Sequence, residues 1–225
     1  MEKRSVALDG PAGAGKSTLA RMASNHFGLM YVDTGALYRC VGLFALRNGV
    51  ASKDSPGVTA LLPKIMLEMK HDGDGVQRML LGGGDVTDDI RSPDVSIYAS
   101  DVSAMPPVRS FLLSLQREMA EKYDIIMDGR DIGTVIMPNA GLKVFLTAEL
   151  EVRAKRRYLE LAEKHAGAVY EEVLRDIQTR DKNDSERAAA PLKAAEGAIL
   201  LDTTHLDLSE SFEALCGLIS KRFGI

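Results

Sequence analysis

Cysteine is scarce in this sequence of 225 residues, and long hydrophobic runs are missing from it. The two cysteines, Cys40 and Cys216, cannot make a disulfide framework, and so few of them suit a reducing compartment. No apolar run approaches the length of a membrane span, and the run at residues 6–8 is too short for a signal peptide. We therefore expect a cytoplasmic protein without a membrane partner.

Histidine clusters and an excess of positive charge are missing as well, and aromatic residues are few. The four histidines are scattered along the chain without the spacing of a metal site. Lysine and arginine number 28 against 32 aspartates and glutamates, which gives a net charge of −4, and aromatic residues make up only 5%. Proteins that bind nucleic acid usually carry a basic surface with stacking aromatic side chains. We expect no nucleic-acid partner, although a locally basic cleft is compatible with this balance.

A phosphate-binding loop is the clearest motif that the sequence contains. Residues 10–17, GPAGAGKS, match the pattern G-x-x-x-x-G-K-[ST]. An apolar run at 6–8 precedes the loop and a helical pattern over 18–27 follows it, which is the strand–loop–helix context that the motif requires. The alternative is a glycine-rich turn with a chance lysine, and the context argues against it.

The loop predicts a site for ATP or GTP with Mg²⁺. Its glycines let several backbone N–H groups converge on a phosphate, and the start of the helix adds its positive dipole end. Lys16 supplies a charge to the outer phosphates, and the Ser17 hydroxyl is the expected magnesium ligand, with Thr18 as the alternative. We assign ATP binding to the residues of this loop: Gly10, Ala12, Gly13, Ala14, Gly15, Lys16, Ser17 and Thr18.

The rest of the chain predicts an α/β fold. Short apolar runs bounded by polar residues are typical of strands buried on both faces, and helical patterns alternate with them. Five such strands are expected, at residues 6–8, 29–32, 125–127, 144–146 and 199–201. We predict a five-stranded, parallel, doubly wound P-loop sheet in a single kinase domain over 1–225, with phosphates bound beyond the carboxyl ends of the strands.

A first insertion separates the second and third strands by more chain than one crossover needs. Residues 60–90 contain two β-like runs around the turn signal Asp72-Gly73-Asp74-Gly75, which predicts a small β module. Helices are expected over 95–122. A disordered insertion is the alternative, but the apolar residues of this segment need burial. We predict that the region from about 34 to 105 binds the acceptor.

A second insertion, residues 150–190, is rich in charge. A solvated helical hairpin explains its acidic part, but its arginines accompany a phosphate-binding core, and we therefore interpret it as a mobile helical lid. Three of its arginines lie at i, i+3 and i+4 and share one helix face: Arg153, Arg156 and Arg157. Two more flank a segment that we interpret as a loop holding Asp181 and Asp184: Arg180 and Arg187.

The surplus of arginines bears on the phosphate acceptor. In DGRDIGT, residues 128–134, Asp128 can serve as the Walker-B carboxylate, whereas Arg130 is an odd neighbour for an attacking water and suits a second anion. The chain has more cations than one triphosphate needs: Arg39, Arg109, Arg130, Arg180 and Arg187. A kinase that joins two phosphorylated substrates has that need. The alternatives are a kinase of another small acceptor, such as AMP or a non-nucleotide acid, and a nucleotide-dependent switch without an acceptor.

Four segments taken together resemble bacterial cytidylate kinase. They are DGPAGAGKST at the start, DTGALYR at 33–39, DGRDIGT at 128–134, and RD…D…R…APL over 180–192. The first is generic to P-loop proteins and the other three are specific, and the resemblance covers nearly the whole chain. It implies a nucleoside monophosphate kinase that transfers the γ-phosphoryl group of Mg-ATP to CMP and dCMP, giving ADP and CDP from CMP. GTP stays open as a donor, and we expect a monomer.

The resemblance also implies a role for each matching residue. The acceptor phosphate is held by Thr34, Arg39 and Arg130, and the cytosine by Ser100, Arg109 and Asp131. The sugar is contacted by Arg180 and Asp184, Arg187 lies near the transferring phosphate, and the lid arginines that approach ATP are Arg153 and Arg157. The catalytic set is then Lys16, Arg130, Arg180 and Arg187. The family often has serine at the position of Thr34 and glycine at that of Ser17.

The chemistry of cytosine supports the assignment of its two main contacts. The Asp131 carboxylate accepts from the N4 amino group, and the Arg109 guanidinium donates to N3 and O2. Uracil carries O4 and N3–H instead, so that it sets an acceptor against the carboxylate and a donor against the guanidinium. We therefore predict that CMP is preferred over UMP. The alternative is that Asp131 forms a structural salt bridge with Arg130 or Arg109.

The segment DTGALYR follows the second predicted strand and opens a helix. We expect Thr34 to cap this helix, whose N-terminus favours anions, and Arg39 to return about one turn later to clamp the acceptor phosphate. Asp33 is expected to support the site without taking part in catalysis. The alternative is that Thr34 is only a cap and Arg39 only a surface charge.

Overall fold

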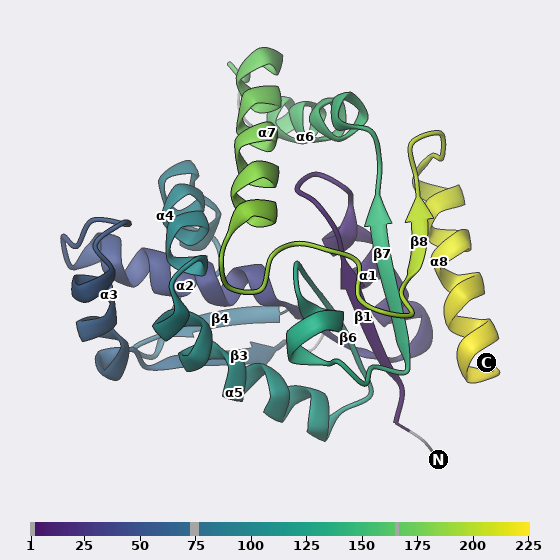
Figure 1. The fold of residues 1–225 in the computed structure, drawn as a ribbon, viewed down its shortest axis with the longest axis horizontal. Coiled ribbons are helices and arrows are strands. Elements are labelled where there is room, and N and C mark those ends of the chain that lie inside the picture. Colours follow the sequence, from purple (N-terminus) through teal and green to yellow (C-terminus); the bar gives the residue numbers. More distant parts are fainter. Residues whose placement is uncertain (1–2, 73–76, 165–166) are drawn as a thin grey trace. The chain divides into compact units, whose positions relative to one another are not determined.

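The chain divides into two compact units (Figure 1). A computed structural model describes residues 3–72, 77–164 and 167–225. The first unit comprises residues 1–29 and 124–225, and the second comprises residues 30–123. The described strands form a five-stranded sheet with the order β2-β6-β1-β7-β8 and a three-stranded sheet with the order β3-β4-β5.

The larger sheet confirms the predicted α/β class and its parallel strands. Its strands are β1 (Ser5–Asp9), β2 (Met30–Asp33), β6 (Ile125–Gly129), β7 (Leu142–Thr147) and β8 (Ile199–Asp202). β1 pairs in parallel with both β6 and β7, and β7 pairs in parallel with β8. The central residues of β1 and β6 are fully buried, as the continuous apolar runs predicted. β2 begins one residue later than expected.

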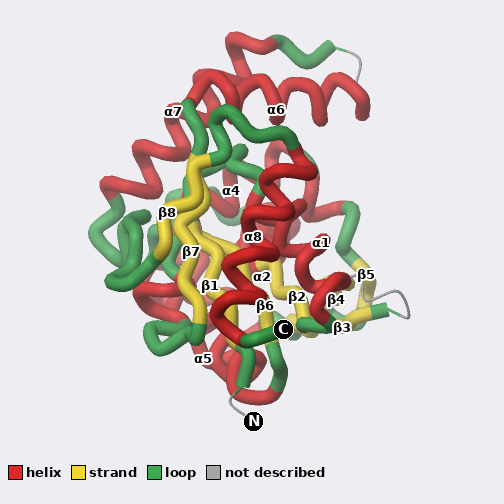
Figure 2. Tube along the Cα trace, turned by 90° about the vertical axis from the view of Figure 1, so that its right-hand side faces the viewer, coloured by secondary structure: helices red, strands yellow, loops and turns green. Residues whose placement is uncertain are grey.

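In the first unit, helices cover the sheet and lie beyond its carboxyl edge. α1 (Lys16–Phe27) and α8 (Leu208–Phe223) lie side by side over one face of the strands (Figure 2). α6 (Leu150–Lys164) follows β7 and packs against α7 (Tyr170–Glu186), beyond the carboxyl end of β7 (Figure 1). The helical character of the predicted lid is confirmed.

One part of the lid prediction is wrong. The segment expected to be a loop with Asp181 and Asp184 belongs to α7, which ends only at Glu186. The segment contains no glycine or proline before Pro191, and the buried residues Val173 and Ile177 keep helical spacing. The two aspartates therefore project from a helix, at fixed positions relative to its axis.

The second unit combines helices with the predicted β module. Its helices are α2 (Thr34–Arg47), α3 (Ser55–Leu61), α4 (Pro93–Ser103) and α5 (Pro106–Lys122). Its small antiparallel sheet is formed by β3 (Leu67–His71), β4 (Gln77–Leu81) and β5 (Gly84–Asp85). Residues 73–75 of the turn expected at 72–75 lie outside the described residues, and Asp72 is described. Met79, Leu81 and Val86 join one core with the helices, which confirms that the insertion is folded.

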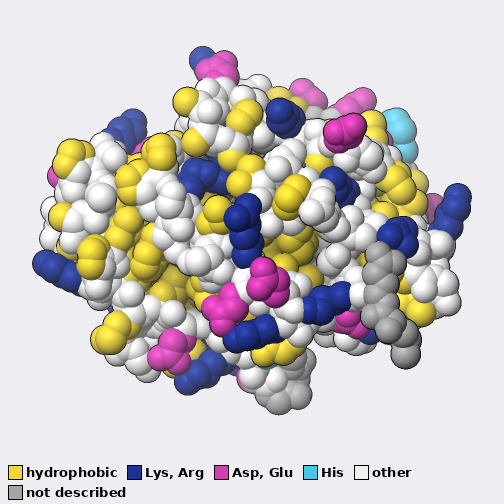
Figure 3. All heavy atoms as spheres, turned by 60° about the horizontal axis from the view of Figure 1, so that its bottom comes forward, with side chains coloured by type: hydrophobic (Ala, Val, Ile, Leu, Met, Phe, Trp, Pro, Cys, Tyr) yellow, Lys and Arg dark blue, Asp and Glu magenta, His cyan; other side chains and the backbone are white. Residues whose placement is uncertain are grey.

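The surface mixes charges of both signs. Figure 3 shows lysine and arginine side chains beside aspartates and glutamates on one face of the molecule. Over the described ranges, no helix combines the length and the apolar character that crossing a membrane requires.

Candidate active site

The phosphate loop follows β1 and depends on its glycines. Gly10 has φ +154° and Gly13 has φ +72°, which are conformations that favour glycine. A Cβ atom on Gly10 would lie 2.0 Å from the carbonyl oxygen of Leu146, which leaves no room for a side chain. The loop therefore passes directly against the end of β7 and turns into α1.

Lys16 is the first residue of α1 and is buried. Its Nζ donates to the carbonyl oxygen of Pro11 at 2.7 Å, across the turn of the loop. Burial, followed by the positive charge of Arg130, lowers the pKa of Lys16 to about 7. An anion in the loop would favour the charged ammonium, because it replaces the hydration that burial removes.

The hydroxyl of Ser17 points at the carboxylate expected from a Walker-B strand. Ser17 Oγ donates to Asp128 Oδ2 at 2.8 Å, at the carboxyl end of β6. Thr18 is exposed. A hydroxyl and a carboxylate are the oxygen ligands that Mg²⁺ prefers. The structure thus favours Ser17 over Thr18 as the hydroxyl beside the expected metal.

Asp9, which was not among the predicted site residues, fixes the loop after β6 that carries Arg130 and Asp131. Its two carboxylate oxygens accept from the backbone N–H groups of Ile132 and Gly133, each at 2.7 Å. These residues open a π-helical turn over Ile132–Ile136, directly after Asp131. Burial raises the pKa of Asp9, although the two N–H donors counteract it. An acid at the carboxyl end of a buried strand is a signal that sequence reasoning can use.

Two arginine–carboxylate pairs join the loop after β6 to the end of α7. Arg130 Nε donates to Asp184 Oδ2 at 2.7 Å, and Arg187 Nη2 donates to Asp131 Oδ1 at 3.3 Å. Arg187 Nη1 lies 3.9 Å from Asp184 Oδ1, so Arg187 faces both carboxylates. Burial alone would lower the pKa of Arg130, but the carboxylate of Asp184 raises it. The structure brings these four predicted residues together, and Asp131 does form an ion pair, with Arg187.

The chain after α7 holds Arg187 in place. Arg187 Nε donates to the carbonyl oxygen of Ala190 at 2.6 Å, and its side chain is almost fully buried. Ala190 has φ +51°, in the left-handed region that residues with a Cβ seldom adopt. The backbone strain at Ala190 accompanies a hydrogen bond that orients one predicted catalytic arginine.

The three lid arginines of α6 have different partners. Arg153 is buried and bonds to the phosphate loop, Arg156 donates to the carbonyl oxygens of Thr203 and Leu206, and Arg157 pairs with Glu160 at 2.8 Å. These three arginines were expected to share one helix face, but their side chains bind different partners. Arg180 on α7 lies 3.7 Å from Asp176, and burial lowers its pKa. Contact of Arg153 or Arg157 with ATP stays a prediction.

In the second unit, the helix cap differs from the prediction. Asp33, and not Thr34, caps α2: its Oδ1 accepts from the Ala36 N–H at 3.0 Å. Thr34 is the first helical residue and is buried. The predicted cap was one residue late. Both residue types cap helices, aspartate better than threonine, and β2 extends to Asp33.

The Asp33 carboxylate also gathers two arginines. Arg91 Nη2 donates to Asp33 Oδ2 at 2.9 Å, and Arg39 Nη1 lies 3.9 Å from the same oxygen. Burial raises the pKa of Asp33, but these cations and the Ala36 N–H outweigh it, and the net shift is downward. Asp33 therefore stays ionised and orients Arg39, which agrees with the supporting role expected for it.

The β module reaches the same turn through a buried glutamine. Gln77 Oε1 accepts from the backbone N–H of Asp33 at 2.8 Å, and its Nε2 is 3.4 Å from the Asp33 carbonyl oxygen. His71 Nε2 lies 2.8 Å from the carbonyl oxygen of Tyr31, which requires the hydrogen on Nε2. Neither Gln77 nor Arg91 was predicted, because nothing in their local sequence indicates a partner so far along the chain.

The predicted base contacts of the second unit lie on α4 and α5. Arg109 Nη1 donates to the carbonyl oxygen of Ser103 at 3.2 Å, and its guanidinium lies 5.8 Å from the centre of the Tyr38 ring. The carbonyl oxygen of Ser100 accepts from the Ser103 hydroxyl at 2.8 Å. Arg109 and Ser100 thus share one neighbour, Ser103.

Comparison with known proteins decides the family. The family model described as cytidylate kinase matches residues 6–221. The chain belongs to the cytidylate kinase family. The cytidylate kinase of Caldicellulosiruptor bescii is 46% identical over 98% of this chain and 97% of its own length. That of Carboxydothermus hydrogenoformans is also 46% identical, over 96% of this chain and 97% of its own length.

The fold has a distant counterpart among solved structures. A crystal structure of an uncharacterized protein from Eubacterium ventriosum aligns with 98% of this chain and 99% of its own, with a TM-score of 0.52 and 12% identity. At this identity the likeness concerns the fold alone. As a member of the cytidylate kinase family, the chain is a phosphotransferase.

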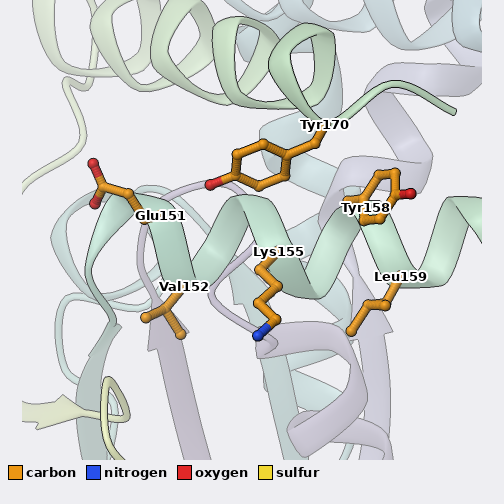
Figure 4. A pocket seen from close by; sticks show the side chains of 6 residues that line it. All are labelled: Glu151, Val152, Lys155, Tyr158, Leu159 and Tyr170. Carbon is orange, nitrogen blue, oxygen red and sulfur yellow. The ribbon is translucent and has the colours of Figure 1, made fainter.

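A surface hollow of about 400 Å³ is lined by residues other than the predicted site residues. It is lined by Glu151, Val152, Lys155, Tyr158, Leu159 and Tyr170, on α6 and the start of α7 (Figure 4). The Tyr158 and Tyr170 rings meet edge to face with their centres 6.0 Å apart. The lining is mainly apolar and includes none of the site residues, so we assign the chemistry elsewhere.

Gln77 should contribute to both the stability of the fold and the binding of the acceptor, although it is not a predicted site residue. Gln77→Met leaves the N–H and carbonyl groups of Asp33 without these partners, and we expect a loss of about 1–3 kcal/mol in unfolding free energy. Denaturant unfolding measures this loss. We also expect a higher KM for the acceptor, because Asp33 orients Arg39.

Gln116→Met is the matched control. Gln116 is likewise buried in the second unit, but its Nε2 has no hydrogen-bond partner among the described residues. The same substitution there should be neutral or stabilising. Equal losses at the two positions would show that the hydrogen bonds of Gln77 are unimportant.

Proposed function

We propose that this member of the cytidylate kinase family transfers the γ-phosphoryl group of Mg-ATP to CMP and dCMP, giving ADP and CDP from CMP. The observation that carries the proposal is the carboxyl end of β6. This strand supplies Asp128 to Ser17 of the phosphate loop, and the next residues are an anion-binding arginine, Arg130, and an acceptor of hydrogen bonds, Asp131. The names of the relatives support CMP as the acceptor.

The reaction needs positioning and charge neutralisation more than covalent chemistry. A phosphate oxygen of CMP attacks the γ-phosphorus in line, a new P–O bond forms, and the bond to the bridging oxygen of ADP breaks. No general base is required, because the acceptor phosphate is already ionised. In our proposal Lys16 holds the outer phosphates of ATP, and Arg39 and Arg130 hold the phosphate of CMP. Arg180 and Arg187 neutralise charge as it shifts to ADP.

The residues present fit a magnesium ion that is carried mainly by the nucleotide. Ser17 Oγ and Asp128 would hold it, directly or through water. Among the described residues, no group of three or more acidic, histidine or cysteine side chains forms a dedicated metal site. When bound, Mg²⁺ supplies charge neutralisation to the phosphate oxygens.

We further propose that both units act as one kinase domain, with the acceptor region over about 34–105 and the lid over about 150–190. The cytoplasm is the proposed compartment, which both cysteines support because they are free. The proposed partners are nucleotides alone, without nucleic acid or membrane, and a monomeric state is testable by light scattering.

The test is the initial rate of ADP production from Mg-ATP with CMP, dCMP, UMP, AMP, GMP or no acceptor. The proposal expects strong turnover with CMP and weak turnover with UMP. Faster turnover with AMP would instead identify a kinase of another acceptor. Hydrolysis that no acceptor accelerates would identify a nucleotide switch.

Asp131 is the residue on which the base preference depends. We expect Asp131→Ala to reduce the ratio of kcat/KM for CMP over UMP by about ten- to a hundredfold, because the N4 amino group loses its acceptor. The variant also frees Arg187 from one partner, so turnover with both substrates should fall.

The ratio separates these two effects. Arg187→Lys disturbs the same ion pair without removing the carboxylate, and it should lower turnover without changing the preference. An Asp131→Ala enzyme that keeps the full preference for CMP would show that other groups read the base.

A further inference from the structure

An ion pair between a buried arginine of α6 and a partly buried aspartate of α7 holds one residue of the phosphate loop. The Ala12 N–H donates to Asp181 Oδ1 at 3.0 Å, and Arg153 Nη1 donates to the Ala12 carbonyl oxygen at 2.9 Å. Arg153 Nη1 also donates to Asp181 Oδ2 at 2.5 Å. The two side chains that hold Ala12 therefore hold each other, one from α6 and one from α7.

The remaining contacts of Arg153 explain why it is so fixed. Its Nε donates to the carbonyl oxygen of Ala148, just after β7, at 2.8 Å. Its exposed fraction is only 7%. A guanidinium with three hydrogen bonds to protein oxygens is not free to search for a ligand. Its influence on a bound nucleotide must then pass through the loop.

Apolar packing completes the attachment of the lid helices to the loop. Ala12 belongs to a buried cluster with Ala154, Val173 and Ile177. At the next position, a Cβ atom on Gly13 would lie 3.0 Å from the Arg153 carbonyl oxygen and 3.1 Å from Ile177 Cδ1. Glycine is therefore needed at this position for the close approach of the helices as well as for the turn.

We propose that Arg153 and Asp181 are positioning residues for the donor site. By fixing both backbone groups of Ala12, the pair sets the direction in which the following N–H groups of the loop point, and so the affinity of the loop for phosphates. The proposal rests on the proposed function only in requiring that the loop binds a nucleoside triphosphate. It is an alternative to the prediction that Arg153 touches ATP itself, and the experiments below distinguish the two.

The decisive variant is Asp181→Asn, which keeps an acceptor for the Ala12 N–H and removes the charge opposite Arg153. We expect the Kd for ATP, measured by calorimetry without any acceptor, to rise about tenfold. In turnover assays the KM for ATP should rise while the KM for CMP stays within about twofold. The binding measurement is independent of the acceptor, so a wrong CMP assignment does not affect it.

Asp124→Asn is the matched control. Asp124 also accepts from one backbone N–H and one guanidinium, Arg4 N at 2.9 Å and Arg4 Nε at 2.8 Å. It precedes β6 and so lies at the amino end of the parallel strands, whereas the loop follows the carboxyl end of β1. Its substitution should leave the Kd for ATP unchanged. An Asp181→Asn protein that binds ATP as the parent does would overturn the proposal.

A double-mutant cycle distinguishes positioning from direct contact. If the pair acts as a unit, Asp181→Ala combined with Arg153→Ala weakens ATP binding no more than the worse single variant does. Additive losses would mean that Arg153 contacts ATP on its own, and would also overturn the proposal. If the double variant does not fold, Arg153→Lys replaces it: a lysine cannot serve all three oxygens, and ATP affinity should stay close to that of Arg153→Ala.

Discussion

Lys16→Met should reduce kcat/KM for ATP by about three to four orders of magnitude. Lys16 is buried at the start of α1, and its ammonium already bonds to the loop itself, at Pro11, so no reorganisation is needed to present it to a phosphate. Methionine fills a similar volume without the charge. The measurement is the initial rate over a range of ATP concentrations.

An exposed lysine provides the control. Lys221→Met, on the last turn of α8, should leave the rate unchanged. A Lys16→Met enzyme with a rate within tenfold of the parent would mean that the loop does not carry the donor phosphates.

Lys16→Met should have a higher free energy of unfolding than the parent near pH 7. A loss of activity in this variant can then be distinguished from a loss of folded protein. The pKa of Lys16 is about 7 in the folded chain and near 10.5 when unfolded. Between these values the unfolded state binds more protons, so the stability of the parent rises with pH. Lys16→Met lacks this dependence. We expect the melting temperature of the variant to exceed that of the parent at pH 7, and the difference to vanish near pH 10.5.

The sequence predicted those parts of the molecule that depend on local pattern. The strands of the large sheet were found because parallel strands are continuous apolar runs, and the phosphate loop because its motif is contiguous. The predicted burial on both faces was wrong for β8, an edge strand whose Ile199 and Leu200 are exposed. The β module was found from two β-like runs around a turn signal, and Met79 is buried there as expected. In each case, neighbours in sequence carry the signal.

The partners of the site residues could not be predicted in the same way. The alternative to base recognition by Asp131 was a salt bridge with Arg130 or Arg109. The structure pairs Asp131 instead with Arg187, which comes from another element. Such pairing depends on where α7 ends, and the sequence placed Asp181 and Asp184 in a loop. Gln77 holds Asp33 from the β module, and only the packed chain brings the two together.

Two proposed site arginines of the first unit, Arg130 and Arg187, pair with carboxylates. Arg130 Nε is 2.7 Å from Asp184 Oδ2, and Arg187 Nη2 is 3.3 Å from Asp131 Oδ1. Buried cations need such partners, because desolvation without compensation costs several kcal/mol each. The carboxylates thereby fix the geometry of the cations. Preorganisation of this kind is what electrostatic catalysis requires.

Arg130→Ala should therefore lower kcat/KM for CMP by about a thousandfold. The substitution removes a cation proposed to hold the acceptor phosphate. Asp184 keeps the more distant guanidinium of Arg187, at 3.9 Å. Asp184 then repels the incoming dianion instead of orienting a cation toward it. The rate is measured with CMP varied at saturating ATP.

Arg130→Lys distinguishes charge from geometry. A lysine restores the charge, but it cannot donate to Asp184 and to the Gly129 carbonyl oxygen while facing a phosphate, as the guanidinium can. We expect it to recover only about a tenth or less of the lost activity. Arg175→Ala, an exposed arginine of α7, should have no effect. Unchanged transfer to CMP in Arg130→Ala would show that the acceptor phosphate binds elsewhere. A dianion bound beside Asp184 would be repelled by that carboxylate once the charge of Arg130 is gone.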